Sequence, residues 1–147
     1  MPFWRLFYHV VWGTKNREPI IDDGREETIR KSLRTTSREH QALIHAIGVM
    51  PDHVHFAVSL PPTGTIATFI RDLKGSSSHL INHPGNRPVS LQEFAWQAEY
   101  GVVSFGEASL PTIVAYVENQ RQHHADQSLI HIYEQLERPF TRPSRHN

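Results

Sequence analysis

The 147-residue sequence predicts an α+β fold, in which helices pack on an antiparallel sheet in the ferredoxin-like (split βαβ) pattern. Apolar segments with a period of two predict strands, and apolar residues at helical spacing predict helices. These segments follow one another in the order strand, helix, strand, strand, helix, strand, helix. Hydrophobic residues form 38% and charged residues 20% of the chain, which favours a packed core over disorder.

Three of the four predicted strands lie in the N-terminal half. Residues 3–12 alternate in polarity and predict the first strand. An aspartate at 22 or 23 is expected to cap a polar helix that runs to about residue 39. The apolar segments 43–50 and 53–60 are separated by Pro51 and Asp52, which predicts a hairpin. A two-residue turn would place Gly48 opposite His55 and leave that face low enough for a metal and a substrate to approach.

The C-terminal half contains the fourth strand and the remaining helices. A helix with a threonine cap, at residue 63 or 65, is predicted to end near residue 83, and Gly75 and three serines interrupt its apolar stripe. Residues 95–105 predict the fourth strand. Ser109 is expected to cap the next helix, with Pro111 in its first turn. A last short helix is predicted from residue 128.

Length and composition exclude several classes of protein. We expect one domain over residues 1–137 and a flexible tail over 138–147. The chain has no cysteine, which excludes a disulfide framework, a thiolate zinc site and a cysteine nucleophile. No apolar run approaches the roughly 20 residues of a membrane-spanning helix, and residues 3–12 lack a signal-peptide cleavage site. A cytoplasmic protein without a membrane partner is therefore expected.

The charge balance argues against binding nucleic acid by bulk electrostatics. Fifteen Lys and Arg residues match fifteen Asp and Glu residues, so the formal net charge is zero. Any nucleic-acid site must then be local. The eleven histidines stand out, because histidine is the commonest metal ligand in proteins.

The clearest candidate for a metal site is the pair His53 and His55. Residues i and i+2 of a strand point to the same side, so both imidazoles are expected on one face while Val54 and Phe56 fill the core. Two ligands would then be positioned by the strand itself. An isolated His-X-His tripeptide is more often polar filler on a solvated face, so this motif alone does not establish a metal site.

A second candidate lies on the predicted helix after Ser109. Tyr116 and Gln120 are four residues apart and fall on adjacent positions of one helix face, beside the apolar stripe. A phenol there can be a nucleophile, and an amide oxygen can complete a site for a hard divalent ion. A tyrosine at the core edge with a solvated glutamine is the ordinary alternative.

Four segments together resemble a known family. Residues 50–55 (MPDHVH) resemble the HUH signature (His, hydrophobic, His) of single-tyrosine transposases of the insertion sequence 200/605 group, including REP-associated tyrosine transposases. Residues 8–17 (YHVVWGTKNR), 96–101 (WQAEYG) and 116–124 (YVENQRQHH) resemble the same family in the same order. The resemblance spans residues 3 to 124, and an ordered set of this kind is far more specific than either motif alone.

The resemblance implies metal-dependent cleavage and rejoining of single-stranded DNA. Tyr116 would attack a phosphodiester and form a 5′-phosphotyrosine and a free 3′-hydroxyl. A Mg²⁺ or Mn²⁺ ion held by His53, His55 and Gln120 would polarise the phosphate. His9 has the parity opposite the apolar face and can lie behind the metal ligands, although an ordinary hydrogen-bonded histidine is the simpler interpretation.

Partners follow from the same resemblance. It implies hairpin-forming single-stranded DNA, a homodimer in which the tyrosine helix of one protomer can serve the other, and a bacterial protein associated with the nucleoid when bound to DNA. Residues with the chemistry to hold phosphates are Lys15, Asn16, Arg17, Lys74 and Ser76. The basic residues of the first helix form another candidate stripe, and Trp12 or Tyr100 can stack on unpaired bases.

Three other functions stay open at this stage. A domesticated relative would bind hairpin DNA without cutting it. A replication initiator or relaxase would share the two-histidine site. An unrelated metal-dependent phosphoesterase would use water as the nucleophile and leave no protein–DNA adduct.

The third metal ligand can be Gln120, His123 or His124. Gln120 is one helical turn from Tyr116, about 6 Å along the axis. His123 shares the face of the tyrosine but is about 10 Å along, and His124 turns into the apolar stripe. We therefore expect Gln120 to be the ligand, and an amide oxygen suits Mg²⁺ or Mn²⁺.

Overall fold

The computed structural model describes residues 3–83, 93–120 and 134. Two short 3₁₀ helices, Lys15–Arg17 and Glu107–Ser109, accompany the main elements. In chain order the main elements are β1 (Phe7–Gly13), α1 (Asp23–Glu39), β2 (Leu43–Met50), β3 (His53–Ser59), α2 (Ile66–Asn82), β4 (Gly101–Phe105) and α3 (Leu110–Glu118). This is the order that the sequence predicts, and the α+β class is confirmed.

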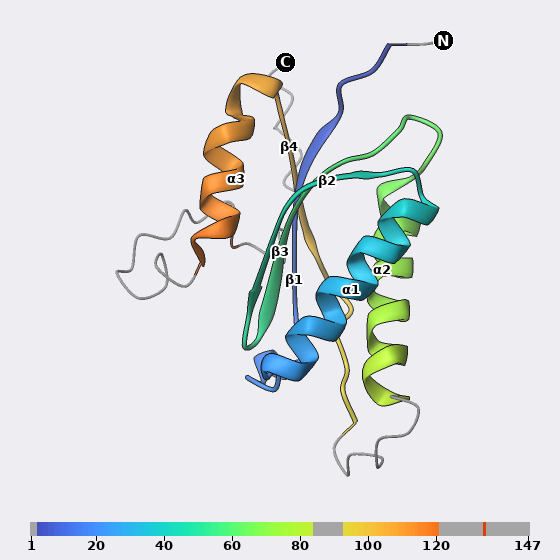
Figure 1. The fold of residues 1–147 in the computed structure, drawn as a ribbon, viewed down its shortest axis with the longest axis vertical. Helices are drawn as coiled ribbons and strands as arrows, with labels where there is room; N and C mark the ends of the chain where they lie inside the picture. The colour runs from blue at the N-terminus through green and yellow to red at the C-terminus, as the bar shows by residue number, and fades with distance from the viewer. Residues whose placement is uncertain (1–2, 84–92, 121–133, 135–147) are drawn as a thin grey trace, which may run out of the picture.

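The four strands form one antiparallel sheet with the order β2-β3-β1-β4. With α1 between β1 and β2, and α2 between β3 and β4, this is the split βαβ arrangement. Figure 1 shows α1 and α2 on one side of the sheet and α3 on the other. We call these sides the α1/α2 face and the α3 face. Because β3 lies between β2 and β1, its side chains occupy the middle of each face.

The main core fills the α1/α2 face. β1 and β3 send alternate residues into it, and both helices contribute apolar stripes. Its most deeply buried members are Val10, Trp12, Ile29, Leu33, Val54, Phe56, Val58, Phe69, Ile70, Leu73 and Phe94. The side chains of β3 that the sequence assigns to the core therefore do lie there.

A smaller core lies under α3. Ile113 and Val117 of the helix pack on Ala46 of β2 and Ala57 of β3. These two strand residues carry only a methyl group, so the helix can come close to the sheet. The hairpin has the expected register, with Gly48 opposite His55 and Ala46 opposite Ala57.

Two strands are shorter than the sequence suggests. β1 begins at Phe7 because its neighbours end there: Phe7 pairs with Ser59 on one side and Phe105 on the other, and residues 3–6 have no strand to join. β4 begins at Gly101, and before it only Trp96 makes an isolated bridge, to Thr14. The backbone carbonyls of residues 97–99 accept hydrogen bonds from the Lys74 side chain instead of from a neighbouring strand.

The helix starts follow the predicted capping chemistry in two of three cases. The Asp22 side chain accepts from the backbone N–H of Arg25, and the Thr65 hydroxyl accepts from that of Thr68. Ser109 makes no such bond, because a 3₁₀ turn leads directly into α3. The predicted helix from residue 128 and the tail at 138–147 lie outside the described residues, apart from Glu134. Within the described part of the chain, no helix is both long enough and apolar enough to cross a membrane.

Candidate active site

The two histidines of β3 lie side by side on the α3 face. Their ring centroids are 5.0 Å apart, and both side chains are almost completely buried. The alternation of the strand predicts their common direction. The sequence predicts an open face here, but α3 covers it, so the site lies at the interface between the sheet and the helix.

Glu134 lies at this pair, although its position in the sequence is far away. Its Oε2 atom is 3.0 Å from Nε2 of His55 and 3.7 Å from Nε2 of His53. One ligand atom from each of the three residues lies within 4.8 Å of the others. Two imidazole nitrogens and a carboxylate oxygen that converge in this way can hold a divalent metal ion.

Tyr116 is the next member of the cluster. Its hydroxyl donates a hydrogen bond of 2.7 Å to Oε1 of Glu134, and its ring lies edge-on to His55 at 5.9 Å. Burial alone would raise the pKa of Glu134, but hydrogen bonds from His55 and Tyr116 and the nearby histidine charges lower it to about 2. Glu134 is therefore a carboxylate at neutral pH and orients the phenol of α3 toward the histidines of β3.

His53 is oriented from behind by a carboxylate. Its Nδ1 atom is 2.6 Å from Oδ1 of Asp52, and Arg17 lies 3.2 Å from the other carboxylate oxygen. Burial would raise the pKa of Asp52, but the contacts with His53 and Arg17 lower it to about 2. The ionised Asp52 accepts the Nδ1 proton of His53 in a hydrogen bond. The lone pair of Nε2 then points at the site, an arrangement typical of metal-binding histidines.

His55 is oriented in the same way by His9 of β1. The Nε2 atom of His9 lies 2.9 Å from Nδ1 of His55, so the two rings share one proton. When His55 presents a bare Nε2 atom to a metal, its Nδ1–H must donate to His9, which must then be the neutral Nδ1–H tautomer. His9 is hydrogen-bonded to His55, as the simpler interpretation expects, and its place behind a metal ligand stays a prediction.

The burial of His9 predicts how stability depends on pH. Burial first, and then the charge of His55, lower the pKa of His9 from 6.5 to about 3, against an opposing effect of Glu134. Between these values the unfolded chain binds a proton that the folded chain does not. The free energy of unfolding should therefore fall as the pH drops below 6.5, by up to about 1.4 kcal/mol per pH unit from this group.

Chemical denaturation of metal-free protein between pH 7 and pH 5 measures this slope. His9→Gln keeps a polar group beside His55 but does not titrate, so we expect a shallower pH dependence than in the wild type. Equal slopes for the two proteins would show that His9 does not carry the effect.

Gln120 is buried with Tyr116 rather than lying at the core edge. Its side chain is 2% exposed, and its Nε2 atom donates to the backbone carbonyl of Tyr116 at 2.8 Å. Its Oε1 atom is buried and has no hydrogen-bond partner among the described atoms. A buried oxygen without a partner is costly and calls for an explanation such as an ion. Gln120 therefore has a buried oxygen available as a ligand, and its place at the metal stays a prediction.

Sequence reasoning did not identify Glu134. It is one polar residue on a short predicted helix, and it lies 79 positions away from His55. No local pattern distinguishes it from the other glutamates of the chain. Only the tertiary contacts identify it as part of the site.

The loop residues predicted to bind DNA differ in their position relative to the site. Lys15 and Asn16 are exposed, and so is Arg17, whose side chain is 41% exposed. Only Arg17 reaches the site, through Asp52 and through its Nη2 atom, 3.4 Å from Nδ1 of His53. Arg17 has a positive φ of 54°, which is uncommon for a residue with a side chain.

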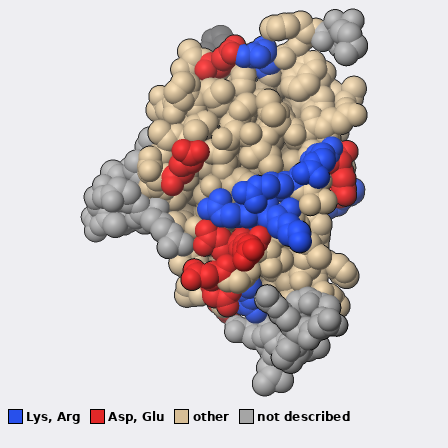
Figure 2. Space-filling view, viewed as in Figure 1, with Lys and Arg blue, Asp and Glu red and all other residues tan. Residues whose placement is uncertain are grey.

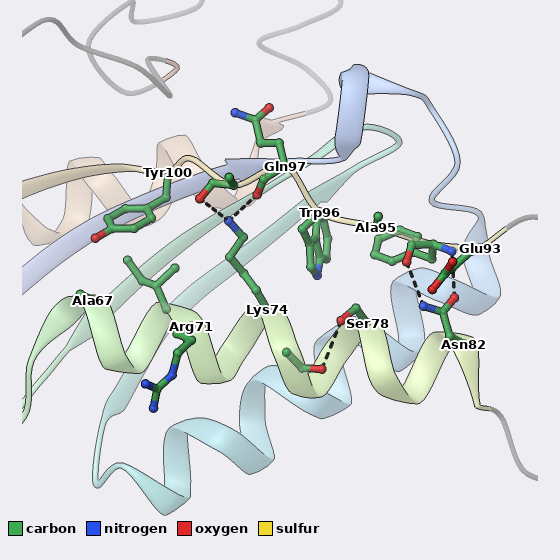
Figure 3. A pocket seen from close by; sticks show the side chains of 14 residues that line it. Ala67, Arg71, Lys74, Ser78, Asn82, Glu93, Ala95, Trp96, Gln97 and Tyr100 are labelled. Carbon is green, nitrogen blue, oxygen red and sulfur yellow. Dashed lines mark hydrogen bonds between the residues drawn. The ribbon is translucent and has the colours of Figure 1, made fainter.

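Lys74 and Ser76 have partners inside the protein. Lys74 Nζ donates to the backbone carbonyls of residues 97, 98 and 99, at 2.6, 3.3 and 3.2 Å, and burial lowers its pKa. Figure 3 shows this lysine reaching from α2 across a cavity of about 520 Å³ to the segment before β4. Ser76 bonds to Thr36 and Ser32 of α1. Both side chains hold parts of the fold together, and their contact with DNA stays a prediction.

The remaining candidates for DNA contact lie on the α1/α2 face. Figure 2 shows a band of Lys and Arg side chains over α1, with Asp and Glu side chains directly below it. α1 contributes Arg25, Arg30, Lys31, Arg34 and Arg38. Arg30 is tied to Glu26 and to the carbonyl of Ile47. Trp12 is fully buried in the main core, so it cannot stack on a base.

Fold and site together define a class of protein. A split βαβ sheet presents a His-hydrophobic-His motif on a central strand, and a helix on the same face brings a tyrosine to it. This combination belongs to single-tyrosine transposases of the HUH superfamily. The chain is a member of the IS200-like transposase family, whose family model matches residues 2–120.

Individual relatives agree with this assignment. The chain is 26% identical over 119 residues to the ISDra2 transposase TnpA of Deinococcus radiodurans, which covers 80% of this chain and 85% of that protein. It is 26% identical over 78 residues to the transposase for insertion sequence element IS200 of Salmonella typhimurium, covering 53% of this chain and 51% of that protein. Both similarities are to transposases.

Solved structures show the same fold. The crystal structure of a Deinococcus radiodurans protein described as a transposase superimposes with a TM-score of 0.62 and 28% identity, over 81% of this chain and 93% of that one. A REP-associated tyrosine transposase bound to a REP hairpin gives a TM-score of 0.63 at 16% identity, over 84% and 74% of the two chains. The second likeness supports the fold alone.

Proposed function

We propose that this protein cleaves and rejoins single-stranded DNA through a covalent 5′-phosphotyrosine. The observation that carries the proposal is the contact of the Tyr116 hydroxyl with a carboxylate that also contacts His55. In the reaction, the phenol oxygen forms a bond to phosphorus and the bond to the 3′ oxygen breaks. The phenol loses its proton, and the leaving oxygen takes one up as a free 3′-hydroxyl. The reverse reaction rejoins a strand without an external energy source.

Glu134 orients the nucleophile more than it deprotonates it. Its pKa of about 2 makes it a weak base, and an ordinary phenol has a pKa of about 10. The carboxylate therefore cannot hold the phenol proton before attack begins. By fixing the hydroxyl at 2.7 Å, it aims the oxygen at the phosphate and accepts its proton as the new bond forms.

We further propose that a divalent ion, Mg²⁺ or Mn²⁺, is held by His53, His55 and Gln120. The convergence of the histidine nitrogens with an oxygen ligand supports a metal at this place, and the buried Oε1 atom of Gln120 supports its role as a ligand. When bound, the ion supplies Lewis-acid polarisation and a template for the scissile phosphate. Glu134 offers an additional oxygen ligand, which no local sequence pattern predicts.

Gln120→Ala is expected to weaken metal-dependent cleavage much more than His123→Ala does. Gln120 is one turn beyond Tyr116 and its amide bonds to the carbonyl of Tyr116, whereas His123, which lies outside the described residues, would be about 10 Å from Tyr116 along the axis of a continuing helix. We expect Gln120→Ala to need at least about tenfold more Mn²⁺ for half-maximal cleavage, with added Mn²⁺ partly restoring activity. Titrating Mn²⁺ in a cleavage assay measures this.

Glu134→Gln keeps the shape of the side chain and removes its charge. Comparing it with Gln120→Ala shows which of the two residues contributes more to Mn²⁺ binding. If Glu134→Gln needs more Mn²⁺ for half-maximal cleavage than Gln120→Ala does, the third ligand would be assigned to Glu134 instead of Gln120. Greater damage from His123→Ala than from Gln120→Ala would move it to His123 and require a different docking of the helix.

The proposed substrate is single-stranded DNA with hairpin-forming ends. The family acts on DNA, and one structural neighbour is described as bound to a REP hairpin. Within this chain, Arg17 is an exposed cation beside His53, where it can meet a phosphate of the bound strand. Lys15 and Asn16 precede it in the same loop and are proposed as further backbone contacts.

A covalent adduct is the test of the proposed function. The protein is incubated with a panel of single-stranded hairpin oligonucleotides and Mg²⁺ or Mn²⁺, and denaturing gels then show whether DNA stays attached. We expect an adduct that needs the metal. Cleavage without an adduct would indicate a phosphoesterase, and binding without cleavage would indicate a domesticated relative.

The homodimeric assembly of the protein and its cellular location remain predictions. Within the described chain, Tyr116 lies beside the His pair of its own protomer. That the tyrosine helix of one protomer can serve the site of the other is proposed from the family. The cytoplasmic location, with association to the nucleoid through bound DNA, is likewise proposed from the family.

A further inference from the structure

Gly48 lies where the end of α3 packs directly against the sheet. It is in β2, directly opposite His55 of β3. A Cβ atom built on Gly48 would lie 2.3 Å from the carbonyl oxygen of Val117 and 3.2 Å from Cγ of Gln120. The helix carbonyl therefore occupies the space that any side chain at residue 48 would need. The open approach that the sequence predicts at this position is filled by α3.

We propose that Gly48 is a positioning residue for the active site. Its missing side chain sets how deeply the last turn of α3 seats against the sheet, and this depth brings Gln120 and Tyr116 to the histidines. The inference rests on the proposed function, because it assigns Gly48 a part in the geometry of that site. Gly48 itself is not proposed to touch the metal or the DNA.

The contact cannot be relieved by a side-chain rotation. The atom at 2.3 Å belongs to the backbone of a helix, and Val117 and Ile113 of that helix are packed on Ala46 and Ala57. Carbon and carbonyl oxygen ordinarily approach to about 3.3 Å, so the last turn of α3 would have to retreat by roughly 1 Å. A displacement of that size at a reacting centre can cost about a hundredfold in rate.

The fold is expected to survive the displacement. A cavity of about 290 Å³ lies beside the contact, lined by Arg30, Gly48, Val49 and residues 117–120. The end of the helix thus has free space next to it and can shift without opening the main core on the other face of the sheet. Gly48→Ala should then unfold cooperatively while its site is out of place.

The test compares Gly48→Ala with Gly75→Ala in the full chain. A Cβ atom placed on Gly75 would have nothing within 4 Å, so the alanine variant there adds the same methyl group without a clash. We expect Gly48→Ala to form the covalent adduct about a hundredfold more slowly. Calorimetric titration with Mn²⁺ should give a dissociation constant raised at least about tenfold. Gly75→Ala should match the wild type in both measurements.

A double-mutant cycle tests whether Gly48 acts through Gln120. In a Gln120→Ala background, Gly48→Ala should cost less Mn²⁺ affinity than in the wild type, because the ligand it seats is already gone. Equal costs in the two backgrounds would overturn the inference, as would an unchanged Mn²⁺ affinity in Gly48→Ala. If the wild type forms no adduct, the proposed function fails, yet the Mn²⁺ titrations still decide the part played by Gly48.

A second variant keeps the test decisive if Gly48→Ala does not fold. Gln120→Asn leaves Gly48 and the seating of α3 in place but shortens the reach of the amide by one carbon. If seating depth limits this reach, Gln120→Asn should lose Mn²⁺ affinity about tenfold, as Gln120→Ala does. Wild-type affinity in Gln120→Asn would show that the reach of residue 120 is not limiting and would overturn the inference.

Discussion

Tyr116→Phe is expected to abolish the covalent protein–DNA adduct. The variant keeps the buried ring that packs against His55 and removes only the oxygen that would attack phosphorus. Loss of the sole nucleophile should lower strand cleavage by at least about a thousandfold. Denaturing gels with labelled hairpin oligonucleotides measure the adduct, and the free energy of unfolding shows whether the fold is intact.

Tyr8→Phe is the matched control for this substitution. Tyr8 is half-buried on β1 and packs against the main core on the α1/α2 face, away from the site. Its variant loses the same hydroxyl oxygen and should keep wild-type cleavage. Cleavage that persists in Tyr116→Phe would remove the tyrosine from the mechanism and leave a hydrolytic phosphoesterase as the better account.

His55→Ala is expected to have the second largest effect, on metal binding and cleavage together. His55 is completely buried, and its ring contacts Glu134, His9 and Tyr116. Removing it deletes one proposed ligand and leaves His9 and Glu134 without their shared partner. Since loss of a group behind a metal ligand costs about 10- to 100-fold, loss of the ligand itself should exceed about a hundredfold in Mn²⁺ affinity and in cleavage.

His45→Ala provides the comparison. His45 lies on the neighbouring strand β2, is partly buried and bonds to Ser59, so its removal also deletes a strand imidazole with a polar partner. We expect the His45→Ala variant to bind Mn²⁺ with the same affinity as the wild type. If both variants lost affinity equally, the effect would come from general damage to the sheet, and the assignment of His55 as a ligand would be wrong.

Much of the site follows from local sequence. The period of two places His53 and His55 on one face of β3, and the Pro51-Asp52 turn sets Gly48 opposite His55. The period of 3.6 predicts that Tyr116 and Gln120 are neighbours on one helix face; α3 ends earlier, at Glu118, but the Gln120 amide still donates to the backbone carbonyl of Tyr116. These relations hold within a single element or hairpin, where backbone geometry alone decides which side chains are neighbours. The order of elements predicts the fold class for the same reason.

Local patterns also gave wrong details where distant groups compete for the same backbone. The segment before β4 alternates like a strand, but its carbonyls bind Lys74 of α2 instead. Residues 3–6 alternate as well, yet the partner strands end before reaching them. A periodic segment becomes a strand only if an unpaired edge lies beside it, and the sequence of the segment does not contain that information.

The sequence by itself determined which side chains each strand and helix presents, because backbone periodicity is a local property. Tertiary structure alone decided that α3 seats on the face that carries the histidines and buries them. It also brought Glu134 to His55 from 79 positions away and tied Lys74 and Ser76 into the fold. These outcomes depend on how whole surfaces fit, here on the small residues Ala46, Gly48 and Ala57 that let a helix approach the sheet.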